Sequence, residues 1–193
     1  MNLRKYKYGI TKASINDIEI KADDKNKVRY KLTVPLQNTG VELLTVIMLN
    51  PSYANKIKSD RTVNRIIKHG YFNNYAKIEV FNISPFYEPS SDKVEGVMKG
   101  NVLSKKINKI NFNYIEEAIK NNPSHILLAT GNVKGPIMRD SYHSVLGVLL
   151  DKQFMVFDIT KGGYAWHPRN LRNTIIEDKP RMAKLKETKI IFE

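Results

Sequence analysis

The chain has 193 residues, of which 41% are hydrophobic and 26% charged, an ordinary balance for a globular domain with a sizeable core. It contains no cysteine, which excludes disulfides, thiolate metal sites and a cysteine nucleophile. Lysine and arginine outnumber aspartate and glutamate by 32 to 19, and the formal net charge of +13 favours polyanionic partners. A basic surface that is merely solvated is the alternative that charge alone leaves open.

The sequence also limits where the protein acts. No apolar stretch approaches the roughly 20 residues of a membrane-spanning helix, and residues 1–6 lack the apolar core of a signal peptide. We therefore expect a cytoplasmic protein without a membrane partner. Four histidines are widely spaced and show no pattern of metal ligands, so we expect no metal. We expect a monomer with one domain over 1–193, in which residues 1–36 form a peripheral hairpin or extension.

Strand and helix patterns alternate along the chain. Residues 28–34 alternate with period two, which predicts an edge or hairpin strand, and the continuous apolar run over 43–49 predicts a strand covered on both faces. Helical patterns begin at Asp60 with a stop at Gly70, and recur over 107–119 and 145–150. Further strands are predicted over 77–83, 125–129 and 154–159. This order predicts an α/β fold with a mainly parallel sheet and helices on both faces.

Polar residues follow the predicted strands. The segments are Asn50-Pro51-Ser52, Phe81-Asn82-Ile83-Ser84-Pro85, Thr130-Gly131-Asn132 and the later loop with His167-Pro168. Because open α/β sheets bind ligands beyond the carboxyl ends of their strands, these segments predict one site. Each has a simpler explanation when taken alone, since Asn, Pro, Ser and Gly are common turn residues and a loop histidine is often only a structural residue.

The order and spacing of these motifs resemble those of a known family. Residues 29–171 resemble a bacterial and phage family of unassigned function, marked by a strand ending in MLNPS, an Asp-x-Thr helix start, a strand with Asn and a closing Gly-x-x-x-His-Pro. Here these are 48–52, Asp60 with Thr62, Asn82 and 163–168. The pattern is also similar to the uracil-DNA glycosylase superfamily, in particular its mismatch-specific branch. That resemblance implies a three-layer α/β/α fold with a short, mainly parallel sheet.

The resemblance further implies an activity and its residues. The activity is that of a monofunctional DNA glycosylase, which flips a modified or deaminated pyrimidine out of DNA and hydrolyses its N-glycosidic bond without a cofactor. Asn50 would hold the attacking water, and His167 would donate a hydrogen bond to the departing base. Asn82 would read the edge of the base, because a carboxamide presents a donor and an acceptor together. The residues implied around the base are Pro51, Ser52, Tyr53 and Phe81.

The residues around the base bear on specificity. Ser52 stands where the uracil-specific branch has a tyrosine that closes off the pyrimidine 5-position. A small side chain there leaves room for a 5-substituent, although Tyr53 would refill part of the space. This favours thymine-like, hydroxymethylated or otherwise modified pyrimidines. Phe81 or Phe86 would stack on a flipped base, and the alternative for either ring is a place in the core.

DNA contacts are expected in two loops. The loop after His167 contains Arg169, Asn170, Leu171 and Arg172, in which Leu171 or Arg169 would wedge into the DNA, while Arg169 and Arg172 equally suit phosphate contacts. Thr130 and Asn132 flank Gly131 before a helix, where backbone amides can bind a phosphate. Turn geometry explains that segment as well, and Asp60 reads equally as a helix N-cap.

Two other functions fit the same residues. One is a nucleic-acid-binding module of the same fold that cleaves nothing, and the other is a hydrolase of free nucleotides. The positions of Asn50 and His167 distinguish an enzyme from a binding module. Their convergence in one pocket would favour catalysis, whereas a wide separation would indicate that each has only a structural role. Base excision in repair and defence against phages with modified DNA are both compatible with the sequence.

Overall fold

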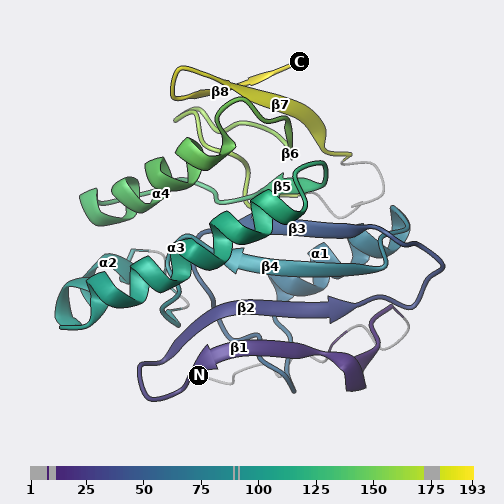
Figure 1. Cartoon of the computed structure of the whole chain (residues 1–193), viewed down its shortest axis with the longest axis horizontal. Helices are drawn as coiled ribbons and strands as arrows, with labels where there is room; N and C mark the ends of the chain where they lie inside the picture. Colours follow the sequence, from purple (N-terminus) through teal and green to yellow (C-terminus); the bar gives the residue numbers. More distant parts are fainter. Residues whose placement is uncertain (1–7, 9–11, 89, 91, 172–178) are drawn as a thin grey trace.

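The computed structural model describes residues 8, 12–88, 90, 92–171 and 179–193. Within these residues the strands are β1 (Glu19–Asp23), β2 (Val28–Pro35), β3 (Leu43–Met48), β4 (Lys77–Asn82), β5 (Ile126–Leu128), β6 (Phe154–Val156), β7 (Arg181–Lys186) and β8 (Lys189–Phe192). They form one eight-stranded sheet in the order β1-β2-β4-β3-β5-β6-β7-β8 (Figure 1).

The sheet is mixed, which corrects the prediction of a short and mainly parallel sheet. The pairings β3–β4, β3–β5 and β5–β6 are parallel, and the other four pairings are antiparallel. The hairpin β1–β2 extends one side of the parallel strands, and the hairpin β7–β8 extends the other. The prediction of a hairpin strand over 28–34 is confirmed, but β2 is not an edge strand because β1 pairs with it.

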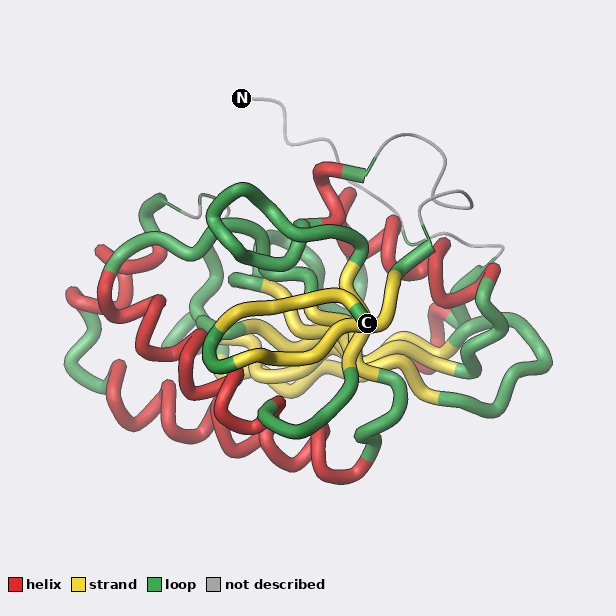
Figure 2. The backbone as a smooth tube through the Cα atoms, turned by 90° about the horizontal axis from the view of Figure 1, so that it is seen from above, coloured by secondary structure: helices red, strands yellow, loops and turns green. Residues whose placement is uncertain are grey.

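Helices lie on both faces of this sheet. They are α1 (Arg61–Phe72), α2 (Val94–Gly100), α3 (Ser104–Asn121) and α4 (Pro136–Leu149) among the described residues. Helix α1 lies on one face, and α2, α3 and α4 lie on the other (Figures 1 and 2). The predicted α/β class with helices on both faces is confirmed.

The apolar run of β3 serves two separate cores. Leu44, Val46 and Met48 pack with the apolar side of α1, whereas Ile47 and Leu49 pack in the core beneath α3 and α4. Because successive side chains of a strand point to opposite faces, a strand covered on both sides needs apolar residues throughout. This explains why the sequence of β3 does not alternate.

Helix α1 continues past the glycine that was predicted to end it. Gly70 lies within the helix, two residues before its last residue, Phe72. A Cβ at Gly70 would lie 2.9 Å from side-chain carbons of both Ile78 and Leu36. The glycine therefore allows α1 to approach the sheet closely, and the helix continues because nothing at this position requires a left-handed backbone.

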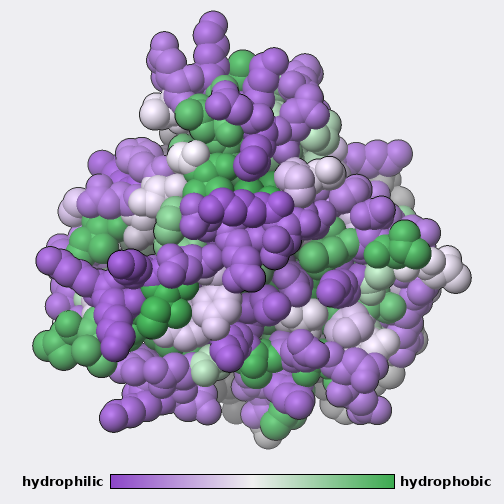
Figure 3. Space-filling model, viewed as in Figure 1, coloured by the Kyte–Doolittle hydropathy of each residue, from purple (hydrophilic) through white to green (hydrophobic). Residues whose placement is uncertain are grey.

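The surface over α2, α3 and α4 is mostly hydrophilic, with apolar residues in separate areas (Figure 3). Among the described residues, none of the helices has the length and apolar character needed to cross a membrane.

Candidate functional site

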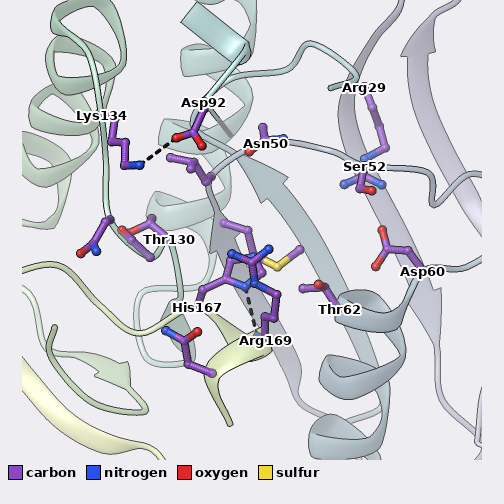
Figure 4. Close-up of a pocket in the computed structure, with 15 residues that line it drawn as sticks. Arg29, Asn50, Ser52, Asp60, Thr62, Asp92, Thr130, Lys134, His167 and Arg169 are labelled. Carbon is purple, nitrogen blue, oxygen red and sulfur yellow. Dashed lines mark hydrogen bonds and ion pairs between the residues drawn. The ribbon is translucent and has the colours of Figure 1, made fainter. Parts of the chain in front are cut away.

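A pocket of about 390 Å³ lies at the carboxyl ends of β3 and β5 (Figure 4). This volume falls in the lower part of the range of small-molecule sites, roughly 300–1,000 Å³. Four parts of the chain supply most of the lining: the end of β3 with the residues after it, the start of α1, the loop after β5, and the 3-10 helix Pro168–Asn170 with His167 just before it. The lining residues are Arg29, Met48, Leu49, Asn50, Ser52, Asp60, Thr62, Asp92, Thr130, Gly131, Asn132, Lys134, His167, Arg169 and Asn170.

Asn50 lies two residues beyond the end of β3, and hydrogen bonds hold this segment in place. Just before it, the backbone ladder between β3 and β4 continues, because the amides of Ile83 and Ser84 donate to the carbonyls of Met48 and Leu49 at 2.9 Å each. The Asn50 Nδ2 group donates to the carbonyl of Glu88. This bond fixes the orientation of the carboxamide and leaves its Oδ1 atom as an acceptor at the pocket.

His167 enters the pocket as a neutral donor. Its Nδ1 atom accepts a hydrogen bond from the backbone amide of Arg169 at 3.1 Å, so the neutral ring carries its proton on Nε2. The pKa of His167 is lowered from 6.5 to about 4, mainly by burial and also by the nearby charges of Arg169 and Arg65, while Asp60 acts in the opposite direction. At neutral pH the imidazole therefore offers one uncharged N–H group.

The histidine loop is fastened to α1 and to the loop after β5. Arg65 of α1 donates through Nη1 to the carbonyls of Pro168 and Arg169, at 2.7 and 2.8 Å. On the other side, the amide of Gly131 donates to the carbonyl of Ala165 at 2.8 Å. These bonds hold His167 between α1, which follows β3, and the loop that follows β5.

Gly131 has two reasons to be glycine. Its φ of +73° lies in the left-handed region, which is costly for residues with a side chain. A Cβ there would also lie 3.0 Å from the Cβ of His167. The loop can approach the histidine this closely because no side chain intervenes.

Replacing Gly131 with alanine is expected to lower the free energy of unfolding by about 1–2 kcal/mol, the usual cost of a left-handed non-glycine residue. It is also expected to displace His167. The matched control is Gly147→Ala, because Gly147 lies in α4 with open space around its Cβ position. This control should raise stability by about 0.5–1 kcal/mol. Urea unfolding measures both, and equal effects of the two variants would contradict the strain assigned to residue 131.

Arg29 of β2 is the buried cation of the site. Its side chain is 1% exposed, Nη1 donates to the carbonyl of Ala54 at 2.8 Å, and Nη2 donates to Oδ1 of Asn82 at 2.7 Å. Burial lowers the pKa of the Arg29 guanidinium, while the charge of Asp60 raises it. An arginine keeps its charge in spite of such a shift, so the pocket contains a fixed positive charge.

Asp60 has a structural function and also reaches the pocket. Its Oδ1 atom accepts from the amide of Val63 at 2.8 Å, which makes it the N-cap of α1, as one interpretation of the sequence predicted. Asp60 and Thr62 both line the pocket. The Asp-x-Thr motif thus starts the helix and supplies polar groups to the site together.

The structure brings together seven of the residues predicted for the site, from segments far apart in the sequence. They are Asn50, Ser52, Thr130, Asn132, His167, Arg169 and Asn170.

Other predicted residues do not line the pocket. Phe81 is 2% exposed, and both it and Phe86 pack in the core beneath α3 and α4, so neither ring is free to stack on a base. Leu171 is buried in the core beside α1, which does not suit a wedge into DNA. Tyr53 is half exposed and outside the lining, and Pro51 is buried. Arg172 lies outside the described residues.

Asn82 does not lie where its predicted role of reading the base edge requires. Its side chain is 1% exposed, does not line the pocket and accepts the hydrogen bond from Arg29. The side-chain Nδ2 group of Asn111 in α3 donates to the backbone carbonyl of Asn82 at 2.8 Å and fixes this strand end. Asn82 therefore holds a group that lines the site instead of reaching the site itself.

Sequence reasoning missed three lining residues. Arg29 lies in a strand that was predicted from its period-two alternation, and no local signal marks this arginine as buried. Asp92 and Lys134 form an exposed ion pair at 2.8 Å that bridges two loops of the pocket (Figure 4). Their sequence neighbourhoods carry no motif. Within the described part of the chain, no group of three or more His, Asp or Glu residues is arranged to hold a metal ion.

The fold and the pocket define an α/β protein with a polar site at the carboxyl edge of the parallel strands. A family described as "Protein of unknown function (DUF1643)" matches residues 29–169, and the chain belongs to this family. The matched segment contains every lining residue except Asn170. Comparisons with curated proteins and with solved structures gave no match. The likeness to uracil-DNA glycosylases stays a prediction.

Proposed function

We propose that this protein is a monofunctional DNA glycosylase that removes a modified or deaminated pyrimidine. The observation that supports the proposal is the convergence of Asn50 and His167 in one pocket, although they follow different strands and lie far apart in the sequence. Each is oriented by a hydrogen bond that leaves one polar atom for a ligand: an acceptor on Asn50 and a donor on His167.

The reaction needs these two groups. When the bond between C1′ of the sugar and the base nitrogen breaks, the electron pair leaves with the base, and water adds to the cationic sugar and loses a proton to solvent. An acceptor orients the water, and the Asn50 Oδ1 atom provides it. A donor stabilises the negative charge that develops on the base, and the neutral His167 Nε2–H provides it.

The charges suit a base inserted from a nucleic acid. Arg169 is exposed and lines the pocket, where it would meet phosphates while the base enters. The formal net charge of +13 supports attraction to DNA. Extrusion of a nucleotide costs a few kcal/mol, which such contacts would offset.

Ser52 supports a substrate with a substituent at the pyrimidine 5-position. It lines the pocket, and the bulkier Tyr53 does not. A small side chain at this position would leave space beside Asn50 for a substituent. Thymine-like, hydroxymethylated and glucosylated pyrimidines are the substrates that this favours.

The test of the proposal is a panel of duplex and single-stranded DNAs that contain uracil, mismatched thymine, or 5-hydroxymethylated or glucosylated pyrimidines. Released base is read as alkali-labile abasic sites. Cleavage of at least one substrate is expected. Tight DNA binding without abasic sites on any substrate would instead favour a nucleic-acid-binding module. A monomeric state and a cytoplasmic setting, in repair or in phage defence, stay predictions.

Arg169→Ala is expected to weaken DNA binding and to lower the slope of log affinity against log salt by about 0.9, the value for one phosphate contact. The control is Lys77→Ala, which removes one exposed charge at the first residue of β4, at the amino edge of the parallel strands. Fluorescence anisotropy over a salt series measures both slopes. An unchanged slope in Arg169→Ala would show that this arginine does not contact a phosphate.

A further inference from the structure

The guanidinium of Arg29 has unused hydrogen-bonding capacity next to the pocket. Two of its five N–H groups bond to Ala54 and Asn82, while the Nε–H group is fully buried without a partner. No carboxylate of the described residues forms an ion pair with it. A buried charge with an unmet donor is costly, and a ligand that accepts from it would recover part of that cost.

Asp60 supplies an acceptor at the same end of the pocket. Its Oδ1 atom caps α1, and its Oδ2 atom has no hydrogen-bond partner among the described residues. Its charge acts on both Arg29 and His167. Figure 4 shows Arg29, Ser52 and Asp60 on one side of the site and Lys134 on the other, with Asn50 and His167 between them.

The two charges define the kind of ligand that fits between them. One cation and one anion give this end of the pocket no net charge, and Asp60 would repel a phosphate. A neutral group that presents an acceptor next to an N–H donor satisfies both side chains. The ring edge of a pyrimidine has this arrangement, as a carbonyl beside N3–H in uracil and as N3 beside the amino group in cytosine.

We propose that Arg29 and Asp60 bind the edge of the pyrimidine, with Arg29 donating to the ring acceptor and Asp60 accepting from the adjacent N–H. This inference rests on the proposed function, because it specifies how the excised base is selected. Asn82 then acts as a positioning residue, since it holds the guanidinium through Nη2. In this proposal Arg29, supported by Asn82, makes the contact with the base edge that the resemblance implied for Asn82.

The test observes Arg29 directly in the intact wild-type protein. The Nε–H signals of the arginines are followed by NMR, with Arg29 assigned from the signal that is lost in Arg29→Lys. Addition of 1-methyluracil or 1-methylcytosine, which keep the ring edge and block the glycosidic position, is expected to shift the Arg29 signal to saturation. The matched ligand 1,3-dimethyluracil has no ring N–H and is expected to bind at least about tenfold more weakly, the cost of one charged hydrogen bond.

Asp60→Asn tests the acceptor without removing the helix cap, because asparagine caps helices as well as aspartate does. It is expected to lower the affinity for 1-methyluracil at least about tenfold. Unchanged affinity together with lost base release would assign Asp60 to the attacking water and overturn its role at the base edge.

Three further outcomes separate this inference from the proposed function. A shift of the Arg29 signal with inorganic phosphate but not with either base would overturn the inference in favour of an anion site. Base release from DNA without any response of Arg29 to free bases would overturn the inference and leave the glycosylase standing. A saturating shift with bases but no abasic site on any DNA would support the base-edge contact and count against the glycosylase.

Discussion

Asn50→Ala is expected to lower the rate of base release at least about 100-fold, the usual loss when one preorganised polar contact to the reacting groups is removed. The affinity for DNA should not change, because Asn50 is half-buried and its proposed contact is with the water and not with the phosphates. The variant also loses the bond to the Glu88 carbonyl, but that bond joins two surface loops and not the core. Single-turnover base release and anisotropy measure the two effects.

The control for Asn50→Ala is Asn121→Ala, which makes the same chemical change at the exposed last residue of α3. It should leave the rate unchanged. Asn50→Asp adds a second comparison, since it keeps an acceptor oxygen for the water but cannot donate to Glu88. Activity between wild type and Asn50→Ala is expected. Equal loss of DNA affinity and of rate in Asn50→Ala would show that the residue binds DNA and does not position water.

His167→Ala is expected to reduce base release by about 10²–10³-fold, because it removes the donor to the departing base. His167→Gln restores an N–H group and should recover part of the rate. The control is His143→Ala, at an exposed position of α4. Loss of rate in the glutamine variant as complete as in the alanine variant would contradict a role as a hydrogen-bond donor.

The pH profile provides an independent test of His167. Because burial lowers its pKa from 6.5 to about 4, the ring stays neutral as the pH falls through 6.5 and becomes charged only near pH 4. The rate of base release should therefore show no inflection near pH 6.5 and should change only as the pH approaches about 4. A limb near pH 6.5 that disappears in His167→Gln would show that the histidine transfers a proton, and that it does not act as a fixed neutral donor.

In the proposed reaction, the neutral His167 and the carboxamide of Asn50 would have different functions from the charged groups of the substrate. Neither group is a strong base, so both would act through orientation and hydrogen bonding, while the leaving base and the phosphates of the substrate carry charge. The two rigid attachments, from Asn50 to Glu88 and from Arg65 to the histidine loop, would keep the geometry constant through the reaction. A slow but selective enzyme is the expected result.

Much of the central fold was predictable because its signals are local. The unbroken apolar run of β3 indicates burial on both faces, and the apolar positions of α1 and α3 recur with the helical period, so these elements follow from residues that are close in sequence. The hairpin β7–β8 was missed because charged residues interrupt its apolar positions and its strands are defined by pairing with each other and with β6. Pairing between backbones cannot be predicted from strands whose side chains show no regular apolar pattern.

The sequence by itself determined which polar residues follow the parallel strands, and therefore that Asn50, Thr130 and His167 are candidates for one site. Only the tertiary structure decided that Arg29 enters the pocket and that Asn82 supports it from behind. The physical reason is that no local pattern over residues 28–34 marks Arg29 as buried. Its burial beside the site depends on the bonds of its guanidinium to Ala54 and Asn82, which are distant from it in the sequence.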